Sequence, residues 1–156
     1  MAIEVVKEYF EQFGLSNRVQ EFEVSSATVE LAAQALGVEP ARIAKTLSFQ
    51  QEEGAMLIVA AGDVKIDNTK FKQEFGRKAK MLTPEEVLQH IGHAIGGVCP
   101  FGIPKEVKVF LDASMQRFET MFPAAGSSNS AIELSLEELF KYSNAIKWVD
   151  VCKPRE

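Results

Sequence analysis

Two glycine-containing loops supply the main-chain groups of this sequence that are best suited to binding a small polar ligand. Residues 96–102 contain three glycines and a proline within seven positions, and residues 125–129 place Gly126 among small side chains. Glycine lets the backbone adopt unusual dihedral angles or approach another group closely. Successive N–H groups in such loops can hold an anion or stabilise an oxyanion. The loops therefore predict a pocket built on main-chain donors, and a plain glycine-rich connection is the alternative.

Lys45 is a charged side chain inside an otherwise apolar strand pattern. Ile43 and Leu47 share its place in the alternation, so Lys45 is expected to point to the same apolar face. A cation on that face needs an anionic or carbonyl partner, because burying it alone is costly. Lys45 is therefore a candidate for holding a substrate group. An edge-strand lysine that reaches back to water is the alternative.

Two further combinations of side chains have the types needed for chemistry. His90 and His93 are three residues apart and could share a helix face, but no third metal ligand follows at a recognised spacing. Cys99 could act as a nucleophile with His93 as its base, or could be a small packed residue beside Pro100. The sequence contains no GxSxG elbow, P-loop or dinucleotide fingerprint. Neither a metal nor a cofactor is predicted.

The elements that position these residues alternate between short strands and short helices. Residues 43–49 and 56–61 have strand character and are joined by a polar turn, which predicts a hairpin. Further strands are expected over residues 19–24, 64–66, 79–81, 108–111, 131–134 and 145–151, and residues 120–122 are expected to lead into the second loop. Helices are expected over residues 3–13, from a cap at Ser25 or Ser26 to Gly37, from a cap at Asn68 to Gly76, over 84–91 after Thr83, over 115–118, and over 136–142 after Ser135. This alternation predicts an α/β fold, a mixed sheet flanked by short helices, in one domain over residues 1–156.

Charge is distributed unevenly along the chain. The net charge is −5, and residues 1–40 carry a balance of −5 whereas residues 64–80 carry +4. The overall acidity argues against a general nucleic-acid coat protein, but the local basic segment could hold a few phosphates. Lys70, Lys72 and Lys78 are its candidate contacts. A solvated helix face is the alternative interpretation.

The remaining features of composition favour a cytoplasmic protein. The longest apolar run, residues 55–61, is too short to span a bilayer. The N-terminal residues include acids where a signal peptide needs a basic start and an apolar stretch. Cys99 and Cys152 are far apart and do not form a disulfide framework. We therefore expect no membrane association.

Four blocks of sequence, in order, resemble the YbaK/ProX family of aminoacyl-tRNA deacylases, whose domain also occurs inserted in bacterial prolyl-tRNA synthetases. The blocks are residues 43–47, 62–70, 96–102 and 125–134, and the resemblance extends from about residue 23 to residue 151. It implies a mixed α/β fold with a curved, partly barrel-like sheet. It also implies hydrolysis of the ester that joins a wrong amino acid to tRNA, with no cofactor.

The resemblance further implies roles for individual residues. Lys45 corresponds to the family's key lysine, and the two loops line the pocket for the terminal adenosine and the aminoacyl group. The residues assigned to catalysis are Lys45, Gly97, Gly102, Gly126 and Ser127. Those assigned to substrate binding are Thr46, Val98, Cys99, Pro100, Phe101, Ser128, Lys70, Lys72 and Lys78. The chain departs from the family at Cys99, where other members often carry serine, and at Ser128 and Asn129, where some carry histidine or glycine.

The expected function is that of a trans-editing hydrolase that deacylates mischarged tRNA, with Cys-tRNA(Pro) and Ala-tRNA(Pro) as the leading substrates. A water, or a group on the substrate itself, would attack the ester carbonyl while main-chain N–H groups stabilise the oxyanion. The expected partner is the aminoacylated 3′ end of tRNA, and prolyl-tRNA synthetase is a candidate second partner. Two alternatives stay open: a non-catalytic module of the same fold that binds a tRNA end or a nucleotide, and a cysteine-dependent hydrolase.

Overall fold

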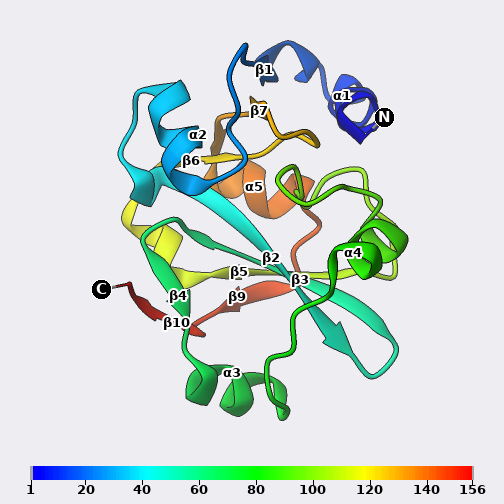
Figure 1. The fold of residues 1–156 in the computed structure, drawn as a ribbon, viewed down its shortest axis with the longest axis vertical. Coiled ribbons are helices and arrows are strands. Elements are labelled where there is room, and N and C mark those ends of the chain that lie inside the picture. Colours follow the sequence, from blue (N-terminus) through cyan, green and yellow to red (C-terminus); the bar gives the residue numbers. More distant parts are fainter. Residues whose placement is uncertain (1, 156) are drawn as a thin grey trace.

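The computed structural model describes residues 2–155, and its centre is a six-stranded mixed sheet with the order β8-β6-β2-β3-β5-β9 (Figure 1). These strands are β2 (Ile43–Gln51), β3 (Gly54–Ala61), β5 (Lys108–Asp112), β6 (Thr120–Pro123), β8 (Leu134–Ser135) and β9 (Lys147–Val149). The sheet curls into a half-barrel with short helices around it. The predicted fold class is therefore confirmed. Met1 and Glu156, the ends of the expected domain, lie outside the described residues, and its extent stays a prediction.

Strands β2 and β3 form the hairpin that the sequence predicted. They pair antiparallel from Ala44 opposite Ala61 to Gln51 opposite Gly54. Parallel pairs join β2 to β6, β3 to β5 and β5 to β9, and β6 pairs antiparallel with β8. Residues of β3 after Gly54 are buried throughout, as expected for a strand that is covered on both faces.

Five helices within residues 2–155 surround the sheet. They are α1 (Ala2–Glu11), α2 (Val29–Leu36), α3 (Asn68–Phe75), α4 (Pro84–Ile91) and α5 (Leu136–Tyr142), and shorter 3-10 segments occupy Ser16–Arg18, Pro40–Arg42 and Ala113–Arg117. The capping boxes predicted at Thr83 and Ser135 are both present. Within residues 2–155, no helix is long and apolar enough to cross a membrane.

Two predicted helix caps were wrong by one or a few residues. The N-cap of α2 is Thr28, whose side chain accepts a hydrogen bond from the Leu31 N–H, and not Ser25 or Ser26. The N-cap of α3 is Asp67, which accepts from the main chain of the first helical turn. Sequence alone offers several consecutive capping side chains in both places, and only the backbone path decides which one reaches the free N–H groups.

The helices cover both faces of the sheet. On one face, Val6 of α1, Ile91 of α4 and Leu139 of α5 join the core around Leu57 and Leu111. On the other face, Phe71 of α3 packs into a second cluster with Phe49, Ile58 and Phe110. Helix α2 covers the end of β2 and β6, where Ala32 and Ala33 contact the cluster of Ile43 and Phe122. Helix α2 therefore packs beside the start of β2.

Several expected strands are shorter than the pattern suggested. Of residues 19–24 only β1 (Gln20–Glu21) is a strand, paired with β7 (Ser130–Ala131), and Val24 is 62% exposed. Residues 79–81 contribute a single bridge, from Met81 to Phe49. Residues 131–134 are divided between β7 and β8.

The chain ends in a small ribbon outside the main sheet. After β9 it leaves the sheet, and β10 (Cys152–Pro154) pairs antiparallel with β4 (Val64–Ile66). Figure 1 shows β4 and β10 together, with the C-terminus next to β4 and with α3 beyond the ribbon. The sequence pattern predicted β4 but not β10, which ends in a proline.

Candidate functional site

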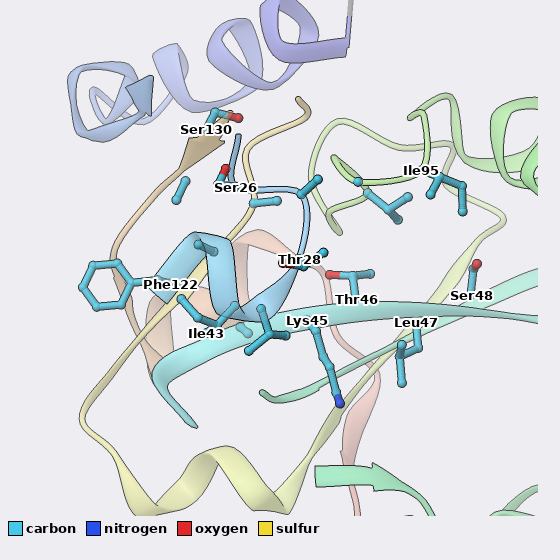
Figure 2. A pocket seen from close by; sticks show the side chains of 18 of the residues that line it. Ser26, Thr28, Ile43, Lys45, Thr46, Leu47, Ser48, Ile95, Phe122 and Ser130 are labelled. Atoms are coloured by element: carbon cyan, nitrogen blue, oxygen red, sulfur yellow. The ribbon is translucent and has the colours of Figure 1, made fainter. Parts of the chain in front are cut away.

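A small cavity lies where the start of β2 meets the N-terminal end of α2. Its volume is about 250 Å³, and its walls come from residues 26–29, 43–48, 95–96 and 130–131, with Ala32, Met81, Val98, Phe122 and Ala124. Figure 2 shows side chains from these separate segments converging on it, among them Ser26, Thr28, Thr46 and Ile95. The walls are apolar apart from a few hydroxyl groups. This composition is typical of a binding site for a small ligand.

One wall of the cavity is an unpaired stretch of strand edge. The ladder of β2 with β6 ends at Ala44, and the next pairing on that edge is the bridge from Phe49 to Met81. The Ser48 C=O, which accepts from the Leu82 N–H, faces this edge. Thr46 lies two residues earlier in the strand, so its N–H and C=O face the same way. The main chain of Thr46 is therefore open to a ligand in the cavity.

The side chain of Thr46 also lacks a partner. Its Oγ1 is buried and makes no hydrogen bond in the described part of the chain. Leaving a buried hydroxyl unpaired costs about 1–3 kcal/mol, so such groups are rare unless a ligand completes them. Thr46 was predicted to bind substrate, and the structure places both its hydroxyl and its main chain at the cavity.

Lys45 borders the cavity but extends to the other side of β2. Figure 2 shows its side chain pointing away from Thr46 and Ser48. Its Nζ donates a hydrogen bond to the C=O of Val64 in β4. Burial lowers the pKa of Lys45, and the positive charge of Arg155 lowers it further. The expectation that Lys45 points to the face of Leu47 and takes a carbonyl partner is confirmed. Its ammonium lies between the cavity and the β4–β10 ribbon.

The two predicted loops meet behind the cavity. A Cβ atom on Gly97 would lie 2.7 Å from the main chain of Ser127, so only glycine permits this approach. Gly96, with a φ of 95°, and Val98 line the cavity, whereas the Gly97 N–H donates to the Ala94 C=O at 3.0 Å. The loops are thus brought together as expected. Of the residues predicted for catalysis or substrate binding, Lys45, Thr46 and Val98 line the cavity.

Other predicted loop residues lie in the core below the cavity. Cys99 and Phe101 are completely buried, and Pro100 is buried beside them. Gly102 and Gly126 both have positive φ and pack against α1, where a Cβ atom would meet Val5 and Ala2, respectively. These residues shape the loops from behind. Roles for them in binding or catalysis stay predictions.

Cys99 and His93 are in contact, as the nucleophile hypothesis requires, but both are buried. The Cys99 Sγ lies 3.6 Å from the His93 Nε2, which in turn lies 3.1 Å from the Phe101 O. Burial raises the pKa of Cys99 to about 12 and lowers the pKa of His93. The thiol is therefore protonated and shielded, which is the opposite of what a nucleophile needs.

The second loop is tied to the segment before α2. Ser127 donates through its hydroxyl to Ser130 at 2.7 Å, and the Ser128 C=O accepts from the Ser26 N–H at 2.7 Å. Ser128 therefore anchors residues 25–28 over the cavity. Sequence reasoning missed Ser26 and Thr28 as wall residues. The available signal was their capping potential, which indicated a helix start but not what that start faces.

The predicted basic contacts lie apart from the cavity. Lys70 pairs with Asp150 at 3.1 Å and donates to the Cys152 C=O, so it holds α3 to the ribbon. Lys72 and Lys78 line a separate hollow on α3. Their predicted contact with tRNA stays a prediction. Among residues 2–155, no group of three or more His, Cys, Asp or Glu side chains is arranged to hold a metal ion.

Comparisons with known proteins match most or all of the chain. Residues 23–142 match the family model of the aminoacyl-tRNA editing domain. The chain is 55% identical over 157 residues to the uncharacterized protein YwhH of Bacillus subtilis, with 100% of each chain covered. It is 29% identical over 119 residues to EbsC of Enterococcus faecalis, described as a candidate Cys-tRNA(Pro)/Cys-tRNA(Cys) deacylase, covering 75% of this chain and 73% of EbsC. A solved structure of a candidate trans-editing enzyme for prolyl tRNA synthetase superimposes with a TM-score of 0.88 at 30% identity, covering 97% of both chains.

Proposed function

The chain belongs to the family of aminoacyl-tRNA editing domains, and from that premise we propose that it is a trans-editing hydrolase that cleaves the ester of mischarged tRNA. The observation that carries the proposal is the unpartnered Thr46 hydroxyl in a small cavity beside Lys45. The leading substrates are Cys-tRNA(Pro) and Ala-tRNA(Pro). The name of EbsC supports the cysteinyl ester, and the name of the superimposed structure supports a link to prolyl-tRNA synthetase.

The size of the cavity limits which part of the substrate enters it. A volume of about 250 Å³ holds a small aminoacyl group, so the terminal adenosine must lie at the mouth. Ile95 and Met81 are exposed there and offer apolar surface to a base.

The main chain at the open edge of β2 is suited to stabilising the reacting carbonyl. The Gly97 N–H is already engaged with Ala94, whereas the Thr46 N–H faces the cavity edge. We assign the Thr46 N–H as the oxyanion donor, with a water as the attacking group. Removing a single oxyanion donor typically costs about 10²–10³ in rate. An aminoacyl ester is an activated acyl group, so modest stabilisation suffices.

The role proposed for Lys45 is to bind a phosphate of the terminal nucleotides. Its ammonium lies on the far side of β2 from the hydroxyls, where the Val64 carbonyl holds it in place. A cation there attracts the nucleic-acid backbone and leaves the aminoacyl group over the cavity. Lys45→Ala is expected to lower kcat/KM by about 10- to 100-fold, the usual cost of a hydrogen bond to a charged group.

The test is single-turnover deacylation of alanyl-, cysteinyl-, seryl- and prolyl-tRNA with the proline tRNA body. Wild type is compared with Lys45→Ala and with Lys141→Ala, an exposed lysine of α5 that serves as the control. If wild type deacylates one mischarged tRNA and spares prolyl-tRNA, and if Lys45→Ala but not Lys141→Ala slows that reaction, the result supports editing and identifies the substrate. If wild type hydrolyses none of them but still binds tRNA, the non-catalytic module is the better description.

A further inference from the structure

The β4–β10 ribbon presents unpaired positive charge on its outer face. Lys65 and Lys153 are directly opposite one another in the antiparallel register, and both are exposed. Directly opposed residues of such a pair point to the same face. Arg155 follows two residues after Lys153, and its N–H donates to the Asp63 C=O, which continues the pairing. The inner face is apolar, since Val64 and Cys152 pack into the core.

The carboxylates near this face are already engaged. Asp63 forms a two-point ion pair with Arg117 at 2.6 and 2.9 Å. Asp67 accepts from the first N–H groups of α3, and Asp150 pairs with Lys70. Lys153 is near enough to Asp67 to help lower the pKa of that carboxyl, but no ion pair forms between them.

By contrast, the three outward cations have no ion pair within residues 2–155. Lys65, Lys153 and Arg155 make no side-chain hydrogen bond to an acid or a carbonyl in this part of the chain. Like charges directly opposite one another in a two-stranded ribbon are destabilising. Their placement is therefore a cost to the fold that an anionic ligand would relieve.

This face is continuous with the site. The Lys45 Nζ bonds to the Val64 carbonyl in β4, and the charge of Arg155 is close enough to affect the pKa of Lys45. Positive groups thus extend from the edge of the cavity along the ribbon. Lys153 and Arg155 come from the C-terminal end of the sequence, outside the basic segment of residues 64–80.

We propose that the outer face of the β4–β10 ribbon binds the phosphates of the single-stranded 3′ end of tRNA and so directs the terminal nucleotide to the cavity. This inference rests on the proposed function for its ligand. Lysine and arginine side chains that contact phosphates contribute affinity without reading sequence. The ribbon would therefore act on any tRNA, and discrimination would remain with the cavity.

The test is equilibrium binding of an uncharged acceptor-stem RNA across a series of salt concentrations. The ribbon variant is Lys65→Gln, Lys153→Gln and Arg155→Gln combined. The control variant, Lys7→Gln, Lys105→Gln and Lys141→Gln combined, has the same net charge but changes other surfaces. Each phosphate contact that is lost lowers the slope of log Kd against log salt by about 0.7 for a single strand. The ribbon variant is expected to lower it by about 2, and the control by much less.

Two comparisons make the outcomes decisive. Removing the single-stranded 3′ end from the RNA is expected to abolish the difference between wild type and the ribbon variant. Turnover of an aminoacyl-adenosine ester, which has no phosphate, is expected to be the same in both proteins. Equal salt slopes for the ribbon and control variants, or a difference that persists without the single strand, would overturn the inference. Binding is measured without hydrolysis, so a wild type that cleaves no ester would refute only the proposed function.

Discussion

Replacing Thr46 by valine separates the stability of the protein from its activity. Valine has nearly the shape of threonine and removes only the hydroxyl, which is buried and unpartnered in residues 2–155. Since an unpaired buried hydroxyl costs about 1–3 kcal/mol and small shape differences offset part of that gain, we expect Thr46→Val to be zero to about 1 kcal/mol more stable. For a chain of this size, 1 kcal/mol corresponds to about 2–4 °C in Tm.

The same substitution is expected to impair hydrolysis. A hydrogen bond to a charged group contributes about 1.5–3 kcal/mol, so losing a contact with the α-ammonium of the aminoacyl group would lower kcat/KM by about 10- to 100-fold. A contact with a thiol would lower it less, and only for the cysteinyl ester. The assay is thermal unfolding together with kcat/KM on alanyl- and cysteinyl-tRNA. Thr46→Ser, which keeps the hydroxyl, is the matched control and is expected to keep most of the activity.

Two results would refute this reasoning. If Thr46→Val unfolds at a clearly lower temperature, the hydroxyl has a partner within the protein and is not held for a ligand. If both esters are hydrolysed at the wild-type rate, Thr46 does not contact the aminoacyl group through its side chain. The assignment of its N–H as the oxyanion donor would then need separate proof, because the substitution leaves the main chain unchanged.

Two further predictions concern the buried pair behind the cavity. Cys99→Ser is expected to keep kcat within a few-fold of wild type, because burial raises the pKa of the thiol to about 12 and leaves no thiolate at neutral pH. A loss of kcat of about 10³-fold in a folded variant would instead support the hypothesis of a cysteine-dependent hydrolase. Burial also lowers the pKa of His93 below its value in the unfolded chain, so below about pH 6.5 the unfolded chain binds a proton that the folded protein does not. The free energy of unfolding is therefore expected to fall as the pH drops from about 6.5 toward 5, by at most about 1.4 kcal/mol per pH unit. Urea unfolding of wild type and His93→Gln between pH 5 and 7.5 measures this, and a slope that His93→Gln leaves unchanged would assign it to other groups.

The glycine loops illustrate which parts of the site could be predicted from residue types. The need for glycine at position 97 was expected, and the close approach to Ser127 supplies the reason. Composition could not separate residues that face the cavity from those that face the core. Cys99 and Val98 are neighbours in the sequence, yet one is completely buried in the core and the other lines the cavity. That difference depends on the path of the loop across α1.

The basic residues show a similar division. A run of lysines over residues 64–80 was visible in the sequence, but a charge count does not show which cations are already paired. In the structure Lys70 is held by Asp150, whereas Lys65 meets Lys153, which lies in a strand that the pattern did not predict. That strand, β10, ends in Pro154, a residue that argues against a strand, and its position is fixed by its partner rather than by its own sequence.

The sequence by itself determined the α/β class, the hairpin of β2 and β3, the capping boxes of α4 and α5, and the face to which Lys45 points. These features depend on local patterns, because strand alternation and helix capping act over a few neighbouring residues. The tertiary structure alone decided that the edge of β2 is open at Thr46 and that its hydroxyl is left unpaired. It also decided that β10 closes on β4 beside Lys45. Whether an edge is paired depends on segments far away in the chain, and no local pattern encodes the partner that is missing.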